Sequence, residues 1–362
     1  MAEVTRARVL GFRVHAQQLD SEKTDMADAA VLDLGAQDTG PDGALWALAV
    51  RGVDVTALAD DALVGLWTIR GAPHLYRRAD VGRVAAAVAP FSDADAGKRV
   101  YDASKPLKAA GIGNLEALDA VAAAMRKIVT KPTVKGEVST RLTAAMPEPY
   151  LRQCRPCDAT HLYEMPFRLA AVRAGLELEH GTSPPVLRRI PGFKAATRVD
   201  ARFDVIRAYL RLLGPATPQH VAGYLDAPVA DVKERWPDDA VEVRVDGQQR
   251  WILAADAAAL DAGAAKGTRL LGPYDLFLQA KDRPLLVSDA ARAKQLWPVL
   301  GRPGVVLHDG DIGGTWRPRA SSGKLTLAVD LWAKAPRQAV TDQAERLAAF
   351  RNVRLAGVRF TS

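Results

Sequence analysis

The strongest constraint on the fold lies between residues 203 and 257, where helix, turn and strand signals follow one another closely. Apolar residues recur at helical spacing from Phe203 to Leu213, and Gly214-Pro215 ends that segment. Thr217 is a typical N-cap residue, and Pro218 suits the first position of the helix that follows. The sequence therefore predicts two short helices separated by a tight turn.

A third helix and a hairpin complete this pattern. The helix is predicted from Val229 to Trp236, and Pro237 ends it. Apolar residues then alternate from Val241 to Leu253 around Asp246-Gly247, a pair that strongly favours a tight hairpin turn. Three helices followed by a two-stranded hairpin are the elements of a winged helix-turn-helix unit.

Two weaker copies of the pattern precede this one. Leu118–Val129 and Val134–Leu142 are predicted as helices on either side of a proline break, and no hairpin is evident behind them. Nearer the N-terminus, Ala44–Val50 and Ala59–Trp67 are predicted as helices, followed by an extended segment over Thr68–Tyr76. The sequence thus favours tandem winged-helix units.

The C-terminal part has a different character. Strands are predicted at Val305–Leu307 and Lys324–Val329, with a packing helix over Thr341–Phe350. The proline-containing, basic segment Pro184–Ala196 is predicted to be a linker. We therefore expect four segments: residues 1–110, an N-terminal winged-helix unit; 111–197, a helix-turn-helix segment and linker; 198–257, a winged-helix unit; and 258–362, a β-rich unit.

Composition narrows the class of protein further. A chain of 362 residues suits more than one domain, and its formal net charge of +7 favours a polyanionic partner. No apolar run approaches the roughly 20 residues that cross a bilayer, and the charged N-terminal segment with Glu3, Arg6 and Arg8 does not resemble a secretion signal. We expect a cytoplasmic protein. Its two cysteines are too few for a disulfide framework.

Several short segments, in their order and spacing, resemble the AlkZ/YcaQ-type winged-helix DNA glycosylase family. These segments are Leu34-Gly35-Ala36-Gln37-Asp38, Ala44-Leu45-Trp46-Ala47 with Arg51, Arg70-Gly71-Ala72-Pro73-His74-Leu75, Tyr209-Leu210 with Gly214-Pro215-Ala216-Thr217, Leu271-Gly272-Pro273-Tyr274-Asp275, and Asp309-Gly310 with Gly314-Thr315-Trp316-Arg317. The resemblance spans most of the chain. It implies an α+β fold of tandem winged helix-turn-helix units with a C-terminal β-rich element, C-shaped around a concave basic channel.

The resemblance also implies an activity. Family members hydrolyse the N-glycosidic bond of alkylated purines in DNA. These purines are alkylated at N7 or are crosslinked. We accordingly expect a monofunctional DNA repair glycosylase that needs no cofactor, binds damaged double-stranded DNA in the nucleoid, does not bind membranes and works as a monomer.

The family's active motif is Gln, an apolar residue and a second Gln, or Gln, an apolar residue and Asp. It aligns with Gly35, Ala36 and Gln37, so that glycine replaces the first Gln. The Gln37 carbonyl is expected to orient the attacking water, and the adjacent Asp38 to act as general base or to stabilise the sugar cation. The alternative is an ordinary helix end and turn, in which Asp38 or Thr39 bonds the local backbone.

Five further residues are predicted to bind DNA. Arg51 is a candidate for a DNA contact, and Arg70 and His74 are candidates for contacts with phosphates or the lesion strand. Trp316 could stack on a base, and Arg317 could contact the backbone. Three of these predictions have a structural alternative: Arg70 paired with a carboxylate, His74 as a satisfied loop histidine, and Trp316 as a core residue.

Two other interpretations remain open. Cys154-Arg155-Pro156-Cys157 with His161 has the spacing of half a zinc site, which Glu164 or His180 would have to complete, and we expect no metal there. The alternative function is a non-catalytic winged-helix DNA-binding protein or transcriptional regulator, for which Gly35 would be no loss.

Overall fold

The computed structural model describes residues 3–40, 43–156, 158–321, 323–332 and 335–361. The chain is a mixed α/β protein that divides into two compact units, each assembled from segments far apart in the sequence. The first unit comprises Met1–Leu58, Ala208–His220 and Pro237–Ser362, and the second comprises Ala59–Arg207 and Val221–Trp236. Among the described residues, each helix is too short or too polar to span a lipid bilayer.

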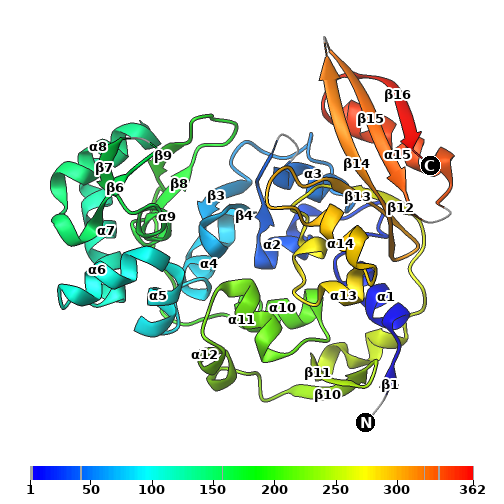
Figure 1. Cartoon of the computed structure of the whole chain (residues 1–362), viewed down its shortest axis with the longest axis horizontal. Coiled ribbons are helices and arrows are strands. Elements are labelled where there is room, and N and C mark those ends of the chain that lie inside the picture. The colour runs from blue at the N-terminus through cyan, green and yellow to red at the C-terminus, as the bar shows by residue number, and fades with distance from the viewer. Residues whose placement is uncertain (1–2, 41–42, 157, 322, 333–334, 362) are drawn as a thin grey trace. The chain divides into compact units, whose positions relative to one another are not determined.

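The first unit is built around a five-stranded sheet in the order β12-β13-β14-β15-β16 (Figure 1). These strands are β12 (Thr268–Leu271), β13 (Gly304–His308), β14 (Asp311–Ser321), β15 (Lys324–Leu331) and β16 (Arg354–Thr361). The first four are antiparallel, whereas β16 runs parallel to β15 and is reached through helix α15 (Arg337–Phe350). Leu325, Leu327 and Val329 alternate along β15 and are fully buried, so one face of the strand forms core.

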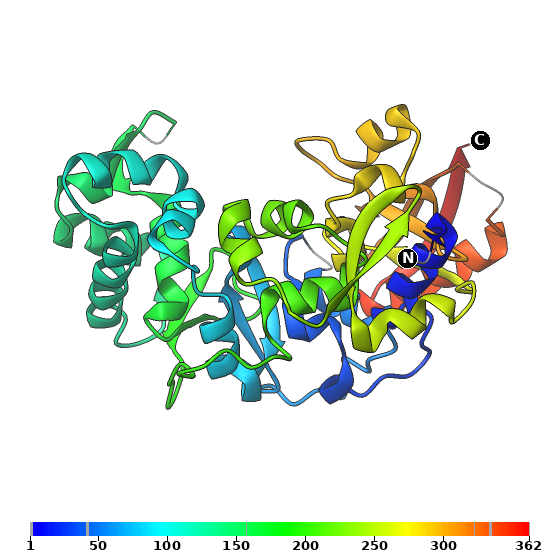
Figure 2. The same ribbon diagram turned by 90° about the horizontal axis from the view of Figure 1, so that it is seen from below.

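A smaller sheet in the order β1-β10-β11 belongs to the same unit. Its strands are β1 (Glu3–Val4), β10 (Ala240–Val245) and β11 (Gln248–Leu253). The antiparallel β10–β11 hairpin is drawn in yellow-green in Figure 2, and β1 pairs with β10 in parallel. Asp246 and Gly247 both have positive φ at its turn, the backbone that a two-residue hairpin requires.

The remaining elements of the first unit are short. They are α1 (Arg6–Ala16), α2 (Val31–Leu34), β2 (Ala36–Gln37), α3 (Gly43–Ala49), α13 (Arg283–Leu286) and α14 (Ala290–Leu296). Buried ion pairs join α1 to two other parts of the unit. Arg13 of α1 forms a bidentate pair with Asp282, just before α13, and Asp282 also pairs with Arg250 of β11. All three side chains are almost completely buried, so this network fixes α1 against the segment that follows β12.

The second unit combines a helical cluster with a sheet. The sheet contains strands in the order β4-β3-β8-β9-β5, namely β4 (Pro73–Arg77), β3 (Leu63–Trp67), β8 (Leu176–Leu178), β9 (Val186–Arg189) and β5 (Thr133–Val134). Its helices are α4 (Val81–Ala87), α5 (Asp93–Arg99), α6 (Ser104–Ala109), α7 (Asn114–Ile128), α8 (Lys135–Ala145), α9 (Glu164–Arg173) and α12 (Val229–Glu234). Leu118, Val121 and Met125 line the buried stripe of α7, as expected for an amphipathic helix.

The elements predicted over residues 203–257 are confirmed. They are α10 (Val205–Leu213), α11 (Pro218–Leu225), α12 and the β10–β11 hairpin, and the boundary between the two units falls within α10 and α11. Thr217 caps α11 as predicted, because its Oγ1 accepts a hydrogen bond from the backbone N–H of His220 at 3.3 Å. The helices predicted around 118–142 and 341–350 and the strands around 305–307 and 324–329 are also confirmed.

Three sequence predictions need correction. Residues 59–67 are not a helix: Val64 and Leu66 alternate as buried residues of β3, which pairs with β4. Residues 184–196 are not simply a linker, because they contain β9, which pairs with both β8 and β5 inside the second unit. The helices α7 and α8 do have a hairpin behind them, formed by β6 (Leu151–Cys154) and β7 (Ala159–Leu162).

Candidate active site

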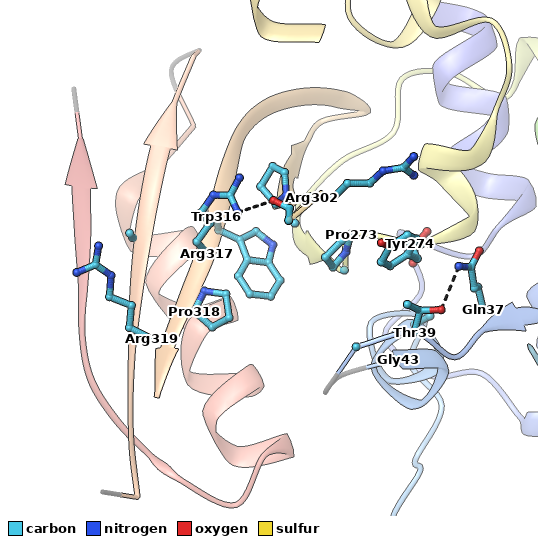
Figure 3. Close-up of a pocket in the computed structure, with 18 residues that line it drawn as sticks. Gln37, Thr39, Gly43, Pro273, Tyr274, Arg302, Trp316, Arg317, Pro318 and Arg319 are labelled. Atoms are coloured by element: carbon cyan, nitrogen blue, oxygen red, sulfur yellow. Dashed lines mark hydrogen bonds between the residues drawn. The ribbon is translucent and has the colours of Figure 1, made fainter. Parts of the chain in front are cut away.

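A cavity of about 440 Å³ opens in the first unit and gathers several of the segments that carried the family resemblance (Figure 3). Its wall comes from the end of β2 and the turn after it, the start of α3, the loops after β12 and before β13, and strands β14 and β15. The lining residues are Gln37, Thr39, Gly40, Gly43, Ala47, Gly272, Pro273, Tyr274, Asp275, Gly301, Arg302, Pro303, Gly304, Trp316, Arg317, Pro318, Arg319 and Ala328. Tertiary folding thus places residues 37, 272–275 and 316–317 around one space.

Gln37 is the last residue of β2 and is half-buried in this wall. Its Nε2 donates a hydrogen bond to Thr39 Oγ1 at 3.1 Å, as Figure 3 shows. Because the amide nitrogen is held in this way, the carbonyl oxygen is left to accept from a water in the cavity. Gly35, two residues earlier, is buried and has a φ of 95°, which disfavours any side chain there.

Asp38 has a different role from Gln37. Its Oδ1 accepts a hydrogen bond from the backbone N–H of Ala44 at 3.0 Å, in the first turn of α3. A Cβ on Gly43 would lie only 2.0 Å from this oxygen, so Gly43 permits the contact. Asp38 therefore makes the local backbone bond that the sequence left open as an alternative, and it is absent from the cavity wall.

The charged side chains that reach the cavity are mainly arginines. Arg302 lies over the Tyr274 ring, with 5.4 Å from its guanidinium carbon to the ring centroid, and Arg317 Nη1 donates to the Gly301 carbonyl at 2.6 Å. Arg319 follows on the same strand. Within the part of the chain that the structure describes, none of the three pairs with a carboxylate. The wall consequently carries unneutralised positive charge beside an aromatic ring, which suits a nucleic acid.

Arg51 is buried and is not available to contact DNA. Its side chain is fully buried, and its two terminal nitrogens bond Asp275 Oδ2 and Oδ1 at 2.7 and 2.8 Å. It also donates to the Ala47 carbonyl and to Gln17 Oε1. The prediction of a DNA contact is wrong because this guanidinium supports the cavity wall from inside.

Trp316 lines the cavity but is a core residue. Only 1% of it is exposed, and its indole nitrogen donates to the Leu271 carbonyl at 3.0 Å. The backbone of Gly304 packs so closely on the ring that a Cβ there would lie 2.3 Å from it. Stacking on a DNA base needs an exposed ring face, so the predicted contact is wrong and the core alternative holds. Arg317, the next residue, is exposed.

Arg70 and His74 lie in the second unit. His74 is buried, and its Nδ1 lies 3.0 Å from Thr68 Oγ1, which also bonds the Tyr76 hydroxyl. Burial, together with the charge of Arg70, lowers the pKa of His74 to about 3, so the imidazole is neutral. The predicted phosphate contact of His74 is therefore wrong. Arg70 bonds the Tyr224 carbonyl and lies over the Tyr224 ring at 4.7 Å, and its DNA contact stays a prediction.

The segment considered for zinc forms the β6–β7 hairpin instead. Cys157 lies outside the described residues, and the described ones contain no group of three metal-ligating side chains. His161 Nδ1 lies 2.8 Å from the Leu162 carbonyl oxygen, and Glu164 pairs with Lys135 and Arg168. These side chains are thus engaged by neighbouring protein groups.

Sequence reasoning missed Thr39, Tyr274, Arg302 and Arg319 as site residues. For Arg319 a signal existed: Arg317 and Arg319 are two positions apart in the sequence, the spacing that places two side chains on one face of a strand such as β14. Arg302 sits in a loop whose position depends on the fold, so the sequence held no comparable signal for it.

Comparison with known families now identifies the class of protein. The family described as DNA glycosylase AlkZ-like matches residues 31–350, which is most of the chain. The chain therefore belongs to the AlkZ-like DNA glycosylase family, and membership implies that it binds DNA.

A solved structure agrees with this assignment. The Streptomyces sahachiroi DNA glycosylase AlkZ is similar to the chain with a TM-score of 0.75 and 21% sequence identity, covering 99% of this chain and 100% of that one. At this identity the similarity establishes the fold. A search of the curated proteins gives no match.

Proposed function

We propose that this chain is a monofunctional DNA glycosylase that hydrolyses the N-glycosidic bond of N7-alkylated or crosslinked purines in double-stranded DNA. The observation that carries the proposal is the Gln37 amide, fixed by Thr39, on a cavity wall that also presents three arginines without carboxylate partners among the described residues. Family membership supports the reaction class. The helix and hairpin sets support the idea that the fold contains tandem winged-helix units.

The reaction needs little general-acid catalysis from the protein. An N7-alkylated purine already carries positive charge, so it departs with the electron pair of its C1′–N9 bond and becomes neutral. The oxygen of a water molecule forms the new bond to C1′, and the water loses one proton to solvent. The enzyme mainly has to hold that water in line, and orientation of this kind is worth several kcal/mol of the barrier.

Gln37 is suited to this task because its amide is anchored at one end only. Thr39 Oγ1 accepts from Nε2, so Oε1 is left to accept a hydrogen bond from the water. Gly35 supplies no second amide, and Asp38 accepts from the Ala44 N–H and is absent from the cavity wall. Gln37 therefore carries the water-positioning role by itself in this chain.

The arginines of the wall bind the DNA backbone in this proposal. Arg302, Arg317 and Arg319 lack carboxylate partners among the described residues, so a phosphate neutralises them without breaking an internal ion pair. Each phosphate contact releases condensed counterions, and DNA affinity should fall steeply with salt concentration. We propose a monomer acting on damaged duplex DNA.

A single-turnover assay tests the activity. Purified protein is mixed in excess with a duplex carrying one bulky N7-alkylguanine, or separately a crosslink, and abasic sites are scored. We expect base release by the wild-type protein and a loss of about 10²-fold or more in rate for Gln37→Ala. Gln338→Ala, an exposed glutamine on α15, is the matched control and should keep the wild-type rate.

The alternative is a non-catalytic DNA-binding protein, and Gly35 is the observation that favours it. A family motif with one of its two polar positions empty could retain the cavity and lose hydrolysis. In that case neither lesion is released by the wild-type protein, although it binds duplex DNA with steep salt dependence. That result would replace the glycosylase proposal with the binding-protein alternative.

A further inference from the structure

The loop between α14 and β13 exposes two large apolar side chains. Val299 is 95% exposed and Leu300 is 86% exposed. Among the described residues, no other large hydrophobic side chain of the exposed class exceeds 51%, so this pair stands out from the rest of the surface. Two adjacent aliphatic side chains in contact with water form a small apolar surface that a partner can cover.

The stem of this loop is firmly held on both sides. Trp297, before the tip, stacks against the Arg283 guanidinium at 4.9 Å. After the tip, the Gly301 carbonyl accepts from Arg317 Nη1 at 2.6 Å, and Gly304 packs on the Trp316 ring. Only the tip therefore projects, on a stem that the core of the first unit fixes.

The tip also lies directly beside the candidate active site. Gly301 and Arg302, the next two residues, line the same cavity as Gln37. Arg302 and Arg317 bring positive charge to the base of the loop, and no carboxylate among the described residues neutralises either of them. An apolar tip with basic residues at its base matches a DNA base stack between two phosphate backbones.

We propose that Val299 and Leu300 form an apolar wedge that inserts between base pairs beside the lesion and unstacks them. The proposal rests on the proposed glycosylase function and adds a positioning role to it. Proteins that open the base stack commonly insert Leu, Ile, Phe or Met side chains, because these fill the space that a displaced base leaves. The wedge would give Gln37 and its water access to C1′ of the damaged nucleotide.

The test separates unstacking from hydrolysis. One substrate carries the N7-alkylguanine paired with cytosine, and the other carries it opposite an abasic site, where little unstacking is needed. A third duplex has 2-aminopurine beside the lesion, whose fluorescence rises when it unstacks. The variants are the double change Val299→Ser with Leu300→Ser, and Val199→Ser, a control at another valine of the exposed class, with 49% of its surface exposed.

The wedge predicts a selective defect. The double variant should lose about tenfold or more in release rate on the paired lesion, keep the wild-type rate on the unpaired lesion, and abolish the fluorescence rise. The control variant should match the wild type on all three duplexes. Equal rates for the double variant and the wild type on the paired lesion would overturn the wedge, and so would equal losses on both lesions.

Two further results separate the wedge from hydrolysis and from self-association. If the wild type releases no base but still raises the fluorescence, and the double variant does not, the wedge stands while the proposed hydrolysis fails. If sedimentation shows that the wild type dimerises and the double variant does not, the tip is a contact between copies of the chain, and the wedge is overturned.

Discussion

Replacing Arg51 by methionine tests whether this residue supports the structure or contacts DNA. The methionine keeps much of the side-chain volume but leaves the buried Asp275 carboxylate without its bidentate partner. Breaking a buried pair from one side costs about 3–5 kcal/mol, against a total unfolding free energy of about 5–15 kcal/mol for a domain. We expect Arg51→Met to lower the urea midpoint strongly.

A double variant shows where this cost comes from. Arg51→Met with Asp275→Leu removes both charges, so most of the lost stability should return. Recovery should be incomplete by about 1 kcal/mol, because Asp275 also accepts a hydrogen bond from the Phe277 N–H in the turn that follows. Urea unfolding followed by tryptophan fluorescence measures all three proteins.

The salt dependence of DNA binding tests whether Arg51 contacts a DNA phosphate. A phosphate contact contributes about 0.9 to the slope of log affinity against log salt. We expect no change in slope for Arg51→Met at a temperature where it is folded, and a fall of about 0.9 for Arg319→Met. Wild-type stability together with a reduced slope for Arg51→Met would refute the structural role assigned to this arginine.

Three further outcomes are expected. Thr39→Val should slow base release about 5- to 10-fold without changing DNA affinity, because one anchoring hydrogen bond is lost, and Thr39→Ser should restore the rate. Gly35→Gln should not improve catalysis, since a side chain at a φ of 95° imposes strain of about 1–3 kcal/mol. Gly35→Ala should lose a similar amount of stability. A Gly35→Gln enzyme that is faster than the wild type and has an unchanged urea midpoint would contradict this expectation. Burial raises the pKa of Asp282, but Arg13 and Arg250 outweigh it and hold the pKa well below its ordinary value. Its stabilisation is therefore complete above the unfolded pKa of about 3.9 and is lost as pH falls below it, so Asp282→Asn should flatten the acid limb of the stability curve, measured by urea midpoints.

Local signals in the sequence were sufficient for many elements. Thr217-Pro218 marks the start of α11, and Asp246-Gly247 marks the hairpin turn, because caps and turns depend on residues a few positions apart. Errors occurred where pairing with a distant strand overrides local preference. Residues 59–67 contain good helix formers, yet residues 63–67 form β3 against β4 and β8.

The candidate site, too, has features that the sequence could predict and features that only the folded structure decided. The sequence, through its resemblance to a known family, predicted that Gln37 belongs to an active motif, and it showed that Gly35 stands where the family has a Gln. It could not determine which arginines reach the cavity. Arg51 and Asp275 are 224 positions apart, and only the folded core shows that they pair. It also shows that Arg302, Arg317 and Arg319 line the cavity, with no carboxylate partner among the described residues. Burial and ion pairing depend on neighbours in space, whereas sequence patterns report neighbours along the chain.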